Sequence, residues 1–184
     1  MKKLMFWTLC SLLFIACNDQ KKEEPTTETT PAAAAETKET PPAEFADAKY
    51  VDIGKKGLAA LSAGDVDGWV AAYADNAMYY WNGGDSISGK AAIAEYWKKR
   101  RTEVIDSLNY SSDIWLPVKV NTPQQAAQAP GVWLLGWYKV DAKYKTGKRM
   151  SQWIHTDMHF DANDKVDRVI MYIDRAPINA AMKK

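Results

Sequence analysis

The stretch from Ala59 to Trp97 contains a series of helix, strand and turn signals whose order restricts the fold more than any other part of the chain. Gly64 and Asp65 interrupt a helical pattern, because glycine ends helices and aspartate caps the helix that follows. Ala77–Trp81 is typical of a strand, and the Asn-Gly-Gly-Asp sequence at 82–85 is typical of a turn. This segment therefore predicts a helix, a sharp break, a second helix, a strand, a turn and a third helix.

The remaining elements follow from the spacing of the apolar residues. The first helix is expected over 45–63, with Gly64 as its stop, and the third over 91–103. Strand patterns follow at 110–120, 132–144, 149–160 and 166–174. Helices first and a long antiparallel sheet afterwards indicate an α+β domain over residues 45–184.

The N-terminus has the pattern of a targeting segment. Lys2 and Lys3 precede an apolar run at 4–16 that is too short to span a bilayer. The four residues before Cys17 resemble the lipobox of bacterial lipoproteins, although Phe14 replaces the usual aliphatic residue. That resemblance implies that residues 1–16 are a signal peptide and that a lipid on Cys17 anchors the chain to a membrane. The alternative is an ordinary secretory signal in which Cys17 is incidental.

Residues 17–44, which include the lipidated Cys17, are predicted to form a disordered tether. From Asn18 onwards this stretch is rich in Glu, Lys, Thr, Pro and Ala and has no aromatic residue, so it cannot bury enough surface to order itself. The sequence Lys-Lys-Glu-Glu at 21–24 resembles the acidic signals that send some lipoproteins to the outer face of the outer membrane. We therefore expect a cell-envelope location at the outer membrane, with a merely solvated spacer as the alternative.

Cysteine content and charge exclude several functions. Cys10 would leave with the signal peptide and Cys17 would be acylated, so the folded domain has no thiol for a disulfide, a thiolate metal site or a nucleophile. The formal net charge of the chain is +1, without the basic excess of nucleic-acid-binding proteins. No nucleic-acid partner is predicted.

Several short sequences in the domain resemble one superfamily. They are Ala60–Asp65, Tyr73–Ala77, Ser88–Lys90, His159–Asp161 and Asp164–Val166. With this spacing, residues 45–176 resemble the nuclear transport factor 2-like superfamily, in its SnoaL-like and ketosteroid isomerase-like branch. The resemblance implies a cone-shaped fold in which three N-terminal helices pack on a strongly curved antiparallel sheet. Members include isomerases, cyclases, dehydratases and binding modules without catalysis, so the resemblance specifies the fold and not the activity.

The isomerase mechanism can be tested at single positions that the resemblance implies. Ketosteroid isomerases use a tyrosine and a buried protonated aspartate as an oxyanion hole, and a second aspartate as the base. The corresponding positions here hold Gly57, Thr156 and Trp81. The threonine hydroxyl could donate one hydrogen bond, but no residue of the three can shuttle a proton. Ketosteroid isomerisation is therefore disfavoured.

A second candidate for catalysis is the strand that carries both histidines of the chain. Alternation places His155, Asp157 and His159 on one face, opposite to Thr156. If Thr156 points into the cone, this face is the outer sheet surface, which often forms a dimer interface in the superfamily. A bulge would reverse the two faces. The histidines lie about 13 Å apart along a strand, too far to share one metal ion.

No metal and no cofactor are predicted. The catalytic alternative uses His155 with Asp157 or Asp174.

Aromatic residues form the largest group of pocket candidates. Tyr79 and Trp81 share the inward face of the first strand. The orientation of Trp133 and Trp137 depends on the turn at Thr146-Gly147: a two-residue turn aims both inward, and a three-residue loop aims both outward. The predicted ligand-binding residues are Tyr79, Trp81, Trp97, Trp133, Trp137 and Thr156.

Three kinds of function fit these observations. The first is a membrane-tethered module that binds a small, largely apolar or aromatic molecule in a pocket lined by Trp and Tyr. The second is an extracytoplasmic isomerase, cyclase or dehydratase. The third is a homodimeric interaction domain with a closed cone. We favour the first, because the predicted interior has no convincing acid–base set.

Overall fold

A computed structural model of the protein describes residues 39–125 and 128–183. The predicted signal peptide at 1–16, Cys17 and the tether up to residue 38 lie outside the described residues. Within the described part, none of the helices is both long enough and apolar enough to cross a membrane.

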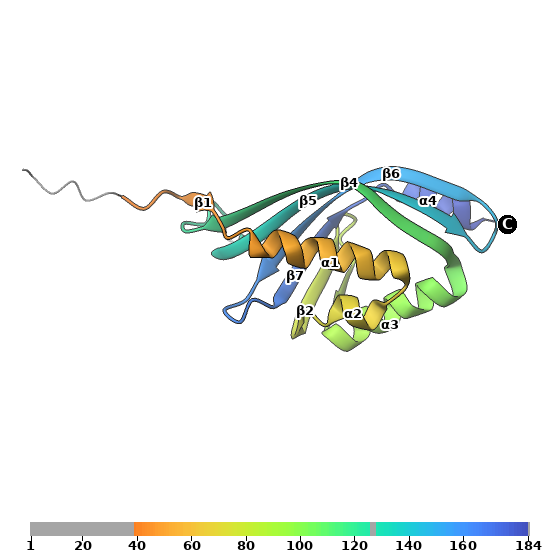
Figure 1. The fold of residues 1–184 in the computed structure, drawn as a ribbon, viewed down its shortest axis with the longest axis horizontal. Coiled ribbons are helices and arrows are strands. Elements are labelled where there is room, and N and C mark those ends of the chain that lie inside the picture. Colours follow the sequence, from red (N-terminus) through yellow and green to blue (C-terminus); the bar gives the residue numbers. More distant parts are fainter. Residues whose placement is uncertain (1–38, 126–127, 184) are drawn as a thin grey trace, which may run out of the picture. The chain divides into compact units, whose positions relative to one another are not determined.

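The described domain is a curved sheet with helices on its concave side (Figure 1). The helices are α1 (Lys49–Ala63), α2 (Val66–Val70), α3 (Lys90–Lys99), a π-helical turn η1 (Arg100–Val104) and α4 (Arg175–Met182). The strands are β1 (Ala43–Phe45), β2 (Tyr73–Trp81), β3 (Ser86–Ser88), β4 (Ile105–Val120), β5 (Gly131–Tyr144), β6 (Arg149–Phe160) and β7 (Val166–Tyr172). Within this part of the chain the strands form one sheet in the order β1-β4-β5-β6-β7-β2-β3.

The predicted α+β class is confirmed, with one correction and two additions. The sheet is not wholly antiparallel, because β2 and β7 pair in parallel. Strand β1 adds to the edge of β4, and helix α4 follows β7. The sequence pattern predicts neither element. Strand β1 is exposed and held through its backbone, and α4 is short, so neither has the apolar periodicity that marks longer elements.

The break after the first helix is confirmed in detail. Gly64 adopts a left-handed conformation with φ of 81°, and its N–H donates to the carbonyls that α1 leaves open at its end. The carboxylate of Asp65 accepts a hydrogen bond from the N–H of Gly68 at 2.8 Å and so caps α2. The chain turns sharply between two helices at the place where the sequence predicts it.

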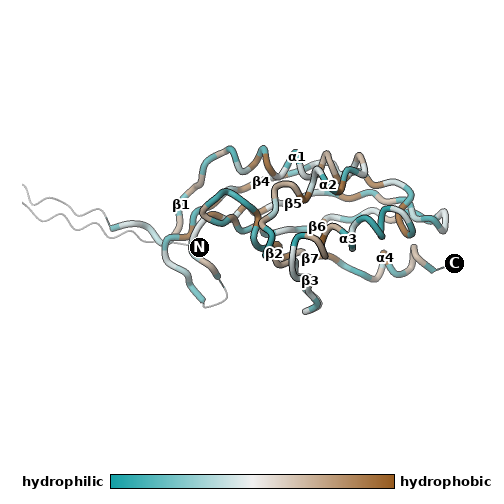
Figure 2. The backbone as a smooth tube through the Cα atoms, turned by 90° about the horizontal axis from the view of Figure 1, so that it is seen from below, coloured by the Kyte–Doolittle hydropathy of each residue, from teal (hydrophilic) through white to brown (hydrophobic). Residues whose placement is uncertain are grey.

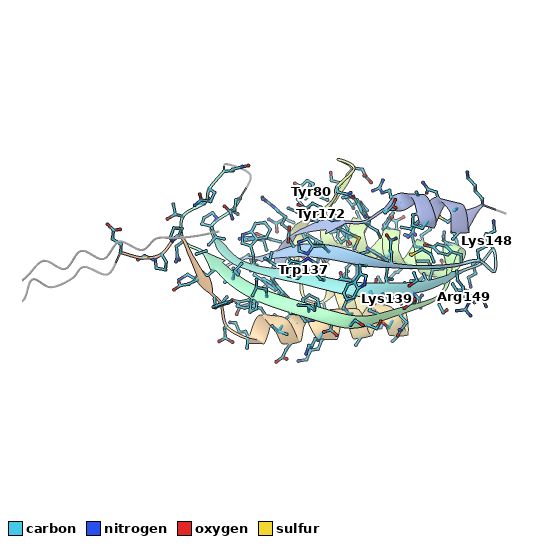
Figure 3. All side chains as sticks on the ribbon, turned by 90° about the horizontal axis from the view of Figure 1, so that it is seen from above. Tyr80, Trp137, Lys139, Lys148, Arg149 and Tyr172 are labelled. Carbon is cyan, nitrogen blue, oxygen red and sulfur yellow. The ribbon has the colours of Figure 1, made fainter. Side chains whose placement is uncertain are left out.

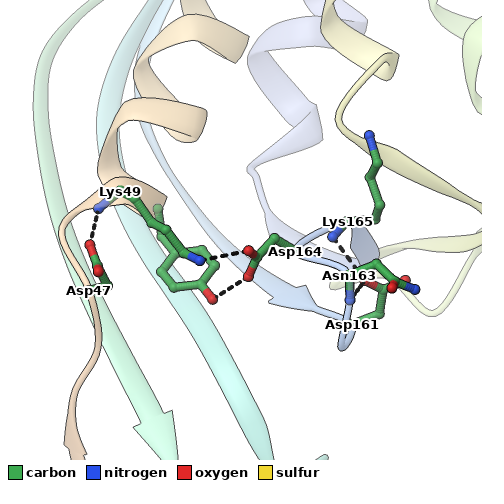
Figure 4. Close-up of polar contacts among 7 residues, drawn as sticks. Asp47, Lys49, Asp161, Asn163, Asp164 and Lys165 are labelled. Carbon is green, nitrogen blue, oxygen red and sulfur yellow. Dashed lines mark hydrogen bonds and ion pairs between the residues drawn. The ribbon is translucent and has the colours of Figure 1, made fainter.

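Asp164 fastens the β6–β7 turn to the start of α1 (Figure 4). Its carboxylate accepts hydrogen bonds from Lys49 Nζ and from the hydroxyl of Tyr50, both at 2.6 Å. These two bonds lower the pKa of Asp164, and the Lys49 bond contributes most. Asp164 has φ of 58°, a left-handed conformation that aspartate tolerates better than most residues. One residue of this turn therefore sets both the chain reversal and the helix position.

The β5–β6 hairpin has the three-residue loop. The N–H of Tyr144 donates to the carbonyl of Lys148 at 2.9 Å, and Gly147 has φ of 87°. This register pairs Trp137 with His155 and Trp133 with His159 on the outer face. Thr156 points inward, as expected. The alternative that aims both tryptophans into the cone is therefore wrong.

A partly buried ring joins α1 to the sheet at the wall of the cone. Trp115, from β4, lies against two glycines on facing elements, Gly54 on α1 and Gly136 on β5. A Cβ atom at Gly54 would lie 2.9 Å from the Trp115 ring, and one at Gly136 would overlap it. Apolar and polar stretches alternate along the helices and strands around this ring (Figure 2). The two glycines therefore make the space that the indole occupies.

We expect Gly136→Ala to lower the free energy of unfolding by about 1–3 kcal/mol, because a methyl group would overfill a packed core. Urea denaturation measures this change. Gly83→Ala is the matched control, since a Cβ there would meet no atom closer than 3.4 Å. Equal stability of the two variants would show that Trp115 does not pack against Gly136 as described.

Candidate functional site

The six predicted ligand-binding residues do not form one pocket. Tyr79 and Thr156 line a cavity inside the cone. Trp81 and Trp97 line a separate pocket at the mouth of the cone, beside α4. The last two candidates, Trp133 and Trp137, lie on the outer face of the sheet. Each of these places has its own chemistry.

The inner cavity is small. Its volume is about 40 Å³, enough for a few water molecules and far below the size of most ligand pockets. Gly57 also lines it, so two of the three positions compared with the isomerase do meet here. Tyr138 and Thr156 share a hydrogen bond of 2.6 Å across this cavity. The third position, Trp81, lies at the mouth.

The inner cavity lacks a group that can exchange protons near neutral pH. Its ionisable side chains are the phenols Tyr73, Tyr79, Tyr110 and Tyr138. Burial raises the pKa of all four, that of Tyr138 to about 12. The phenols therefore keep their protons at neutral pH and can donate hydrogen bonds. No carboxylate or imidazole lines this cavity.

His155 and Asp157 form a pair on the outer face. His155 Nδ1 lies 3.0 Å from the carbonyl of Gly136, and Nε2 lies 2.7 Å from Asp157 Oδ1. Both ring nitrogens of His155 therefore have an oxygen partner within hydrogen-bond distance. Burial raises the pKa of Asp157, while His155 opposes the rise.

Aromatic rings enclose the His155 side chain. The ring stacks between Trp137 and Tyr172, at centroid distances of 4.5 and 5.4 Å. Figure 3 shows Trp137 and Tyr172 on the outer surface of the sheet, away from the helices. The predicted pair therefore exists, but it faces away from the inner cavity.

The other two acid–base candidates have structural partners. His159 is 8% exposed, and its nitrogens contact Asp167 Oδ1 at 2.6 Å and the carbonyl of Pro130 at 3.0 Å. Asp174 accepts a hydrogen bond from the N–H of Ala176 at 2.8 Å and caps α4. The structure thus gives Asp174 a role at a helix end, apart from the His155 pair.

The pocket at the mouth of the cone has a volume of about 200 Å³. Three aromatic rings line it: Trp81 and Tyr96 lie 5.3 Å apart edge to face, and Tyr96 and Trp97 lie 5.9 Å apart. Side chains of α4, among them Ile178 and Met182, line the other side. A cavity of about 150 Å³ holds benzene, so this pocket has room for a single-ring molecule.

Two arginines approach these rings. The guanidinium of Arg175 lies 5.6 Å from the Trp81 ring and donates to both carboxylate oxygens of Asp85 at 2.7 Å. The guanidinium of Arg100 lies 5.7 Å from the Tyr96 ring. Among residues 39–125 and 128–183, no carboxylate pairs with Arg100. The lining therefore combines flat apolar surfaces with positive charge.

Trp97 lines this pocket and has an unused hydrogen-bond donor. Its side chain is 7% exposed, and the indole N–H is buried without an acceptor in the described part of the chain. Buried donors are paired in the great majority of cases, so an unpaired one at a pocket requires an explanation. A bound ligand that carries an acceptor atom would supply the missing partner.

The sequence predicted two of the residues that line this pocket. Trp81 and Trp97 were predicted, whereas Tyr96, Arg100 and Arg175 were not. The spacing of Tyr96 and Arg100, four residues apart on a helix, places both on one face and was an available signal. No local signal joins Asp85 to Arg175, because 90 residues separate them. The described residues include no group of three or more His, Cys, Asp or Glu side chains that could hold a metal ion.

Comparison with known proteins gives the class of the domain. A family model of the SnoaL-like domain matches residues 55–113. The chain is similar to an NTF2-like protein of unknown function from Burkholderia pseudomallei, with 13% identity, a TM-score of 0.58, and coverage of 73% of this chain and 97% of that one. No curated protein matched the chain.

Two further solved structures have the same fold. An LEH-like epoxide hydrolase from M. tuberculosis has 16% identity and a TM-score of 0.51, with coverage of 72% of this chain and 87% of that one. A protein with a ketosteroid isomerase-like fold from Catenulispora acidiphila, in complex with trimethylamine, has 10% identity and a TM-score of 0.53, with coverage of 71% and 92%. Residues 55–113 are therefore similar to the SnoaL-like domain, and the described domain has the NTF2-like fold. At these identities the likeness fixes the fold and leaves the activity open.

Proposed function

We propose that the domain binds a small, flat, largely apolar molecule in the pocket at the mouth of the cone. The buried and unpartnered indole N–H of Trp97 is the observation that carries this proposal. The rings of Trp81 and Tyr96 supply flat apolar surface beside it. The trimethylamine complex of one structural neighbour is in keeping with ligand binding by this fold.

The mouth pocket fits this role better than the other two places. The inner cavity, at about 40 Å³, is too small for an organic ring. The His155 ring is already held on both sides by Trp137 and Tyr172, and both of its nitrogens have partners. Of these three places in the described domain, the mouth alone combines a sufficient volume with a lining residue whose donor is unused.

Benzamide is a suitable first probe, because it is a single ring with an acceptor and no charge. We expect its addition to shift the indole N–H resonance of Trp97 in the NMR spectrum of the full chain. Tyr96→Ala should weaken binding about 2- to 10-fold, since an aromatic contact contributes about 0.5–1.5 kcal/mol. Trp153→Ala, on the outer face, is the control and should leave the affinity unchanged. Binding without a response of Trp97, or no binding, would refute the proposal.

We also propose that the domain is held at the cell envelope by a lipid on Cys17. The apolar run that ends before Cys17 and the tether that follows support this proposal. An outer-membrane location follows from the resemblance of residues 21–24 to surface-targeting signals. In this arrangement the mouth pocket would meet its ligand outside the cytoplasm.

Metabolic labelling with a fatty acid tests the anchor. We expect the wild-type chain and Cys10→Ala to take up label and to sediment with outer membranes. Cys17→Ala should do neither, because the acylated thiol is removed. Label in the Cys17→Ala variant, or an unlabelled wild-type chain in the soluble fraction, would contradict lipidation at this residue.

The outer sheet face supports a further proposal, a homodimer. Trp153, Tyr172 and Ile114 are 54%, 44% and 58% exposed on this face, beside Trp137. Exposed aromatic residues are enriched at protein interfaces, where tryptophan often contributes most to affinity.

Light scattering after size exclusion measures the assembly directly. We expect the detergent-solubilised full chain to have twice the monomer mass. Trp153→Glu should shift it to the monomer, because the change would bury a charge in the interface. Lys55→Glu, on the exposed side of α1, should leave the dimer intact. A monomeric wild-type chain would overturn this assembly without affecting the mouth pocket.

A further inference from the structure

The charges around the mouth pocket do not cancel. Its lining contains two guanidinium groups, Arg100 and Arg175, and one carboxylate, Asp85. Both carboxylate oxygens of Asp85 accept from Nη2 of Arg175, and this contact lowers the pKa of Asp85. One positive charge, that of Arg100, is left over. We propose that the ligand of this pocket is a single-ring carboxylate that Arg100 recognises, an inference that rests on the proposed function.

The position of Arg100 suits this role. It follows α3 directly, at the start of the π-helical turn, four residues after Tyr96. Its guanidinium lies over the Tyr96 ring and is only partly exposed. Burial raises the pKa of Tyr144, and the positive charge of Arg100 opposes that rise. The charge of Arg100 therefore affects a side chain buried in the domain. A ligand carboxylate would supply the ionic partner that Arg100 lacks.

The rings and the indole donor suit the rest of such a ligand. Trp81 and Tyr96 offer apolar surface to a flat ring, and about 200 Å³ limits the ligand to roughly one ring with its substituent. A carboxylate has several acceptor sites, so it can also accept from a further donor such as the Trp97 N–H. The donors of the pocket therefore match an acceptor-only head group on a small ring.

A cationic ligand is disfavoured at the same place. Aromatic rings often bind ammonium groups, but here guanidinium groups already approach the Trp81 and Tyr96 rings. An added cation would face the remaining charge of Arg100 without a free carboxylate in the lining. The pocket thus differs in its preference from a cage for trimethylamine, the ligand of one structural neighbour.

Three probes of nearly equal size separate these possibilities: benzoate, neutral benzamide and cationic benzylamine. Calorimetric titration of the detergent-solubilised full chain gives the affinities, and the Trp97 indole resonance reports the site. We expect benzoate to bind about 10-fold tighter than benzamide, as a charge-assisted bond to arginine implies. Benzylamine should bind weakest of the three.

Arg100→Gln should reduce the preference for benzoate over benzamide to less than about 3-fold, because the charge that favours the carboxylate is removed. Arg100→Lys should retain part of the preference, because the charge remains while the planar fork is lost. Arg149→Gln is the matched control, since Arg149 is an exposed arginine on β6 outside the pocket, and it should keep the full preference. Thermal melts of all three variants check that the fold is intact.

The outcomes distinguish this inference from the proposed function. If benzamide and benzoate bind equally and both shift Trp97, the pocket stands and the carboxylate inference is wrong. If benzylamine binds tightest, the charge preference is the reverse of the one inferred. If none of the probes binds, the proposed function fails as well. A preference for benzoate that survives in Arg100→Gln would assign recognition to another residue.

Discussion

The packing of Trp115 between two glycines governs the rest of this structure. The ring enters the cone from β4 and lies against Gly54 of α1 and Gly136 of β5, so one side chain joins helix and sheet. It also reduces the inner cavity to about 40 Å³. A cone of this fold could hold a ligand at its centre, but here an indole occupies that space. The centre of the cone therefore has no room for an organic ring, and the proposed ligand site lies at the mouth, where α3, the β2–β3 turn and α4 meet.

The mouth pocket depends on contacts that reach across the chain. Its side formed by α4 is fixed at both ends: Asp174 caps the start, and the hydroxyl of Thr146 donates to the carbonyl of Ala181 at 2.6 Å near the end. Lys148 Nζ adds a bond of 2.8 Å to the carbonyl of Lys183. The β5–β6 hairpin loop thus holds the helix that lines the pocket. The register of that hairpin decides the position of α4 as well as the direction of Trp137.

The acid–base pair and the inner cavity lie on opposite faces of β6. The inward residue Thr156 borders a cavity whose ionisable groups, among the described residues, are protonated phenols. The outward residues His155 and Asp157 contact one another, and the His155 ring lies between two surface aromatic rings. Because successive strand residues point to opposite faces, no small shift of a side chain can bring this pair into the cone. The fold retains an acid–base pair and a cavity, and the pleat of one strand keeps them apart.

The order of elements followed from local chemistry that the sequence shows directly. Glycine at 64, a capping aspartate at 65 and strand alternation act within a few residues, so the helix break and the bounds of β6 could be predicted. The same alternation placed His155 and Asp157 opposite to Thr156. Parallel pairing of β2 with β7, the three-residue hairpin loop and the position of α4 depended on contacts between distant segments. The mouth pocket belongs to this second group, because Arg175 meets Asp85 and Trp81 only after the sheet has closed. The sequence alone determined the longer helices and strands and which residues of one strand share a face, because these depend on local chemistry. Tertiary packing decided which of those faces enclose space.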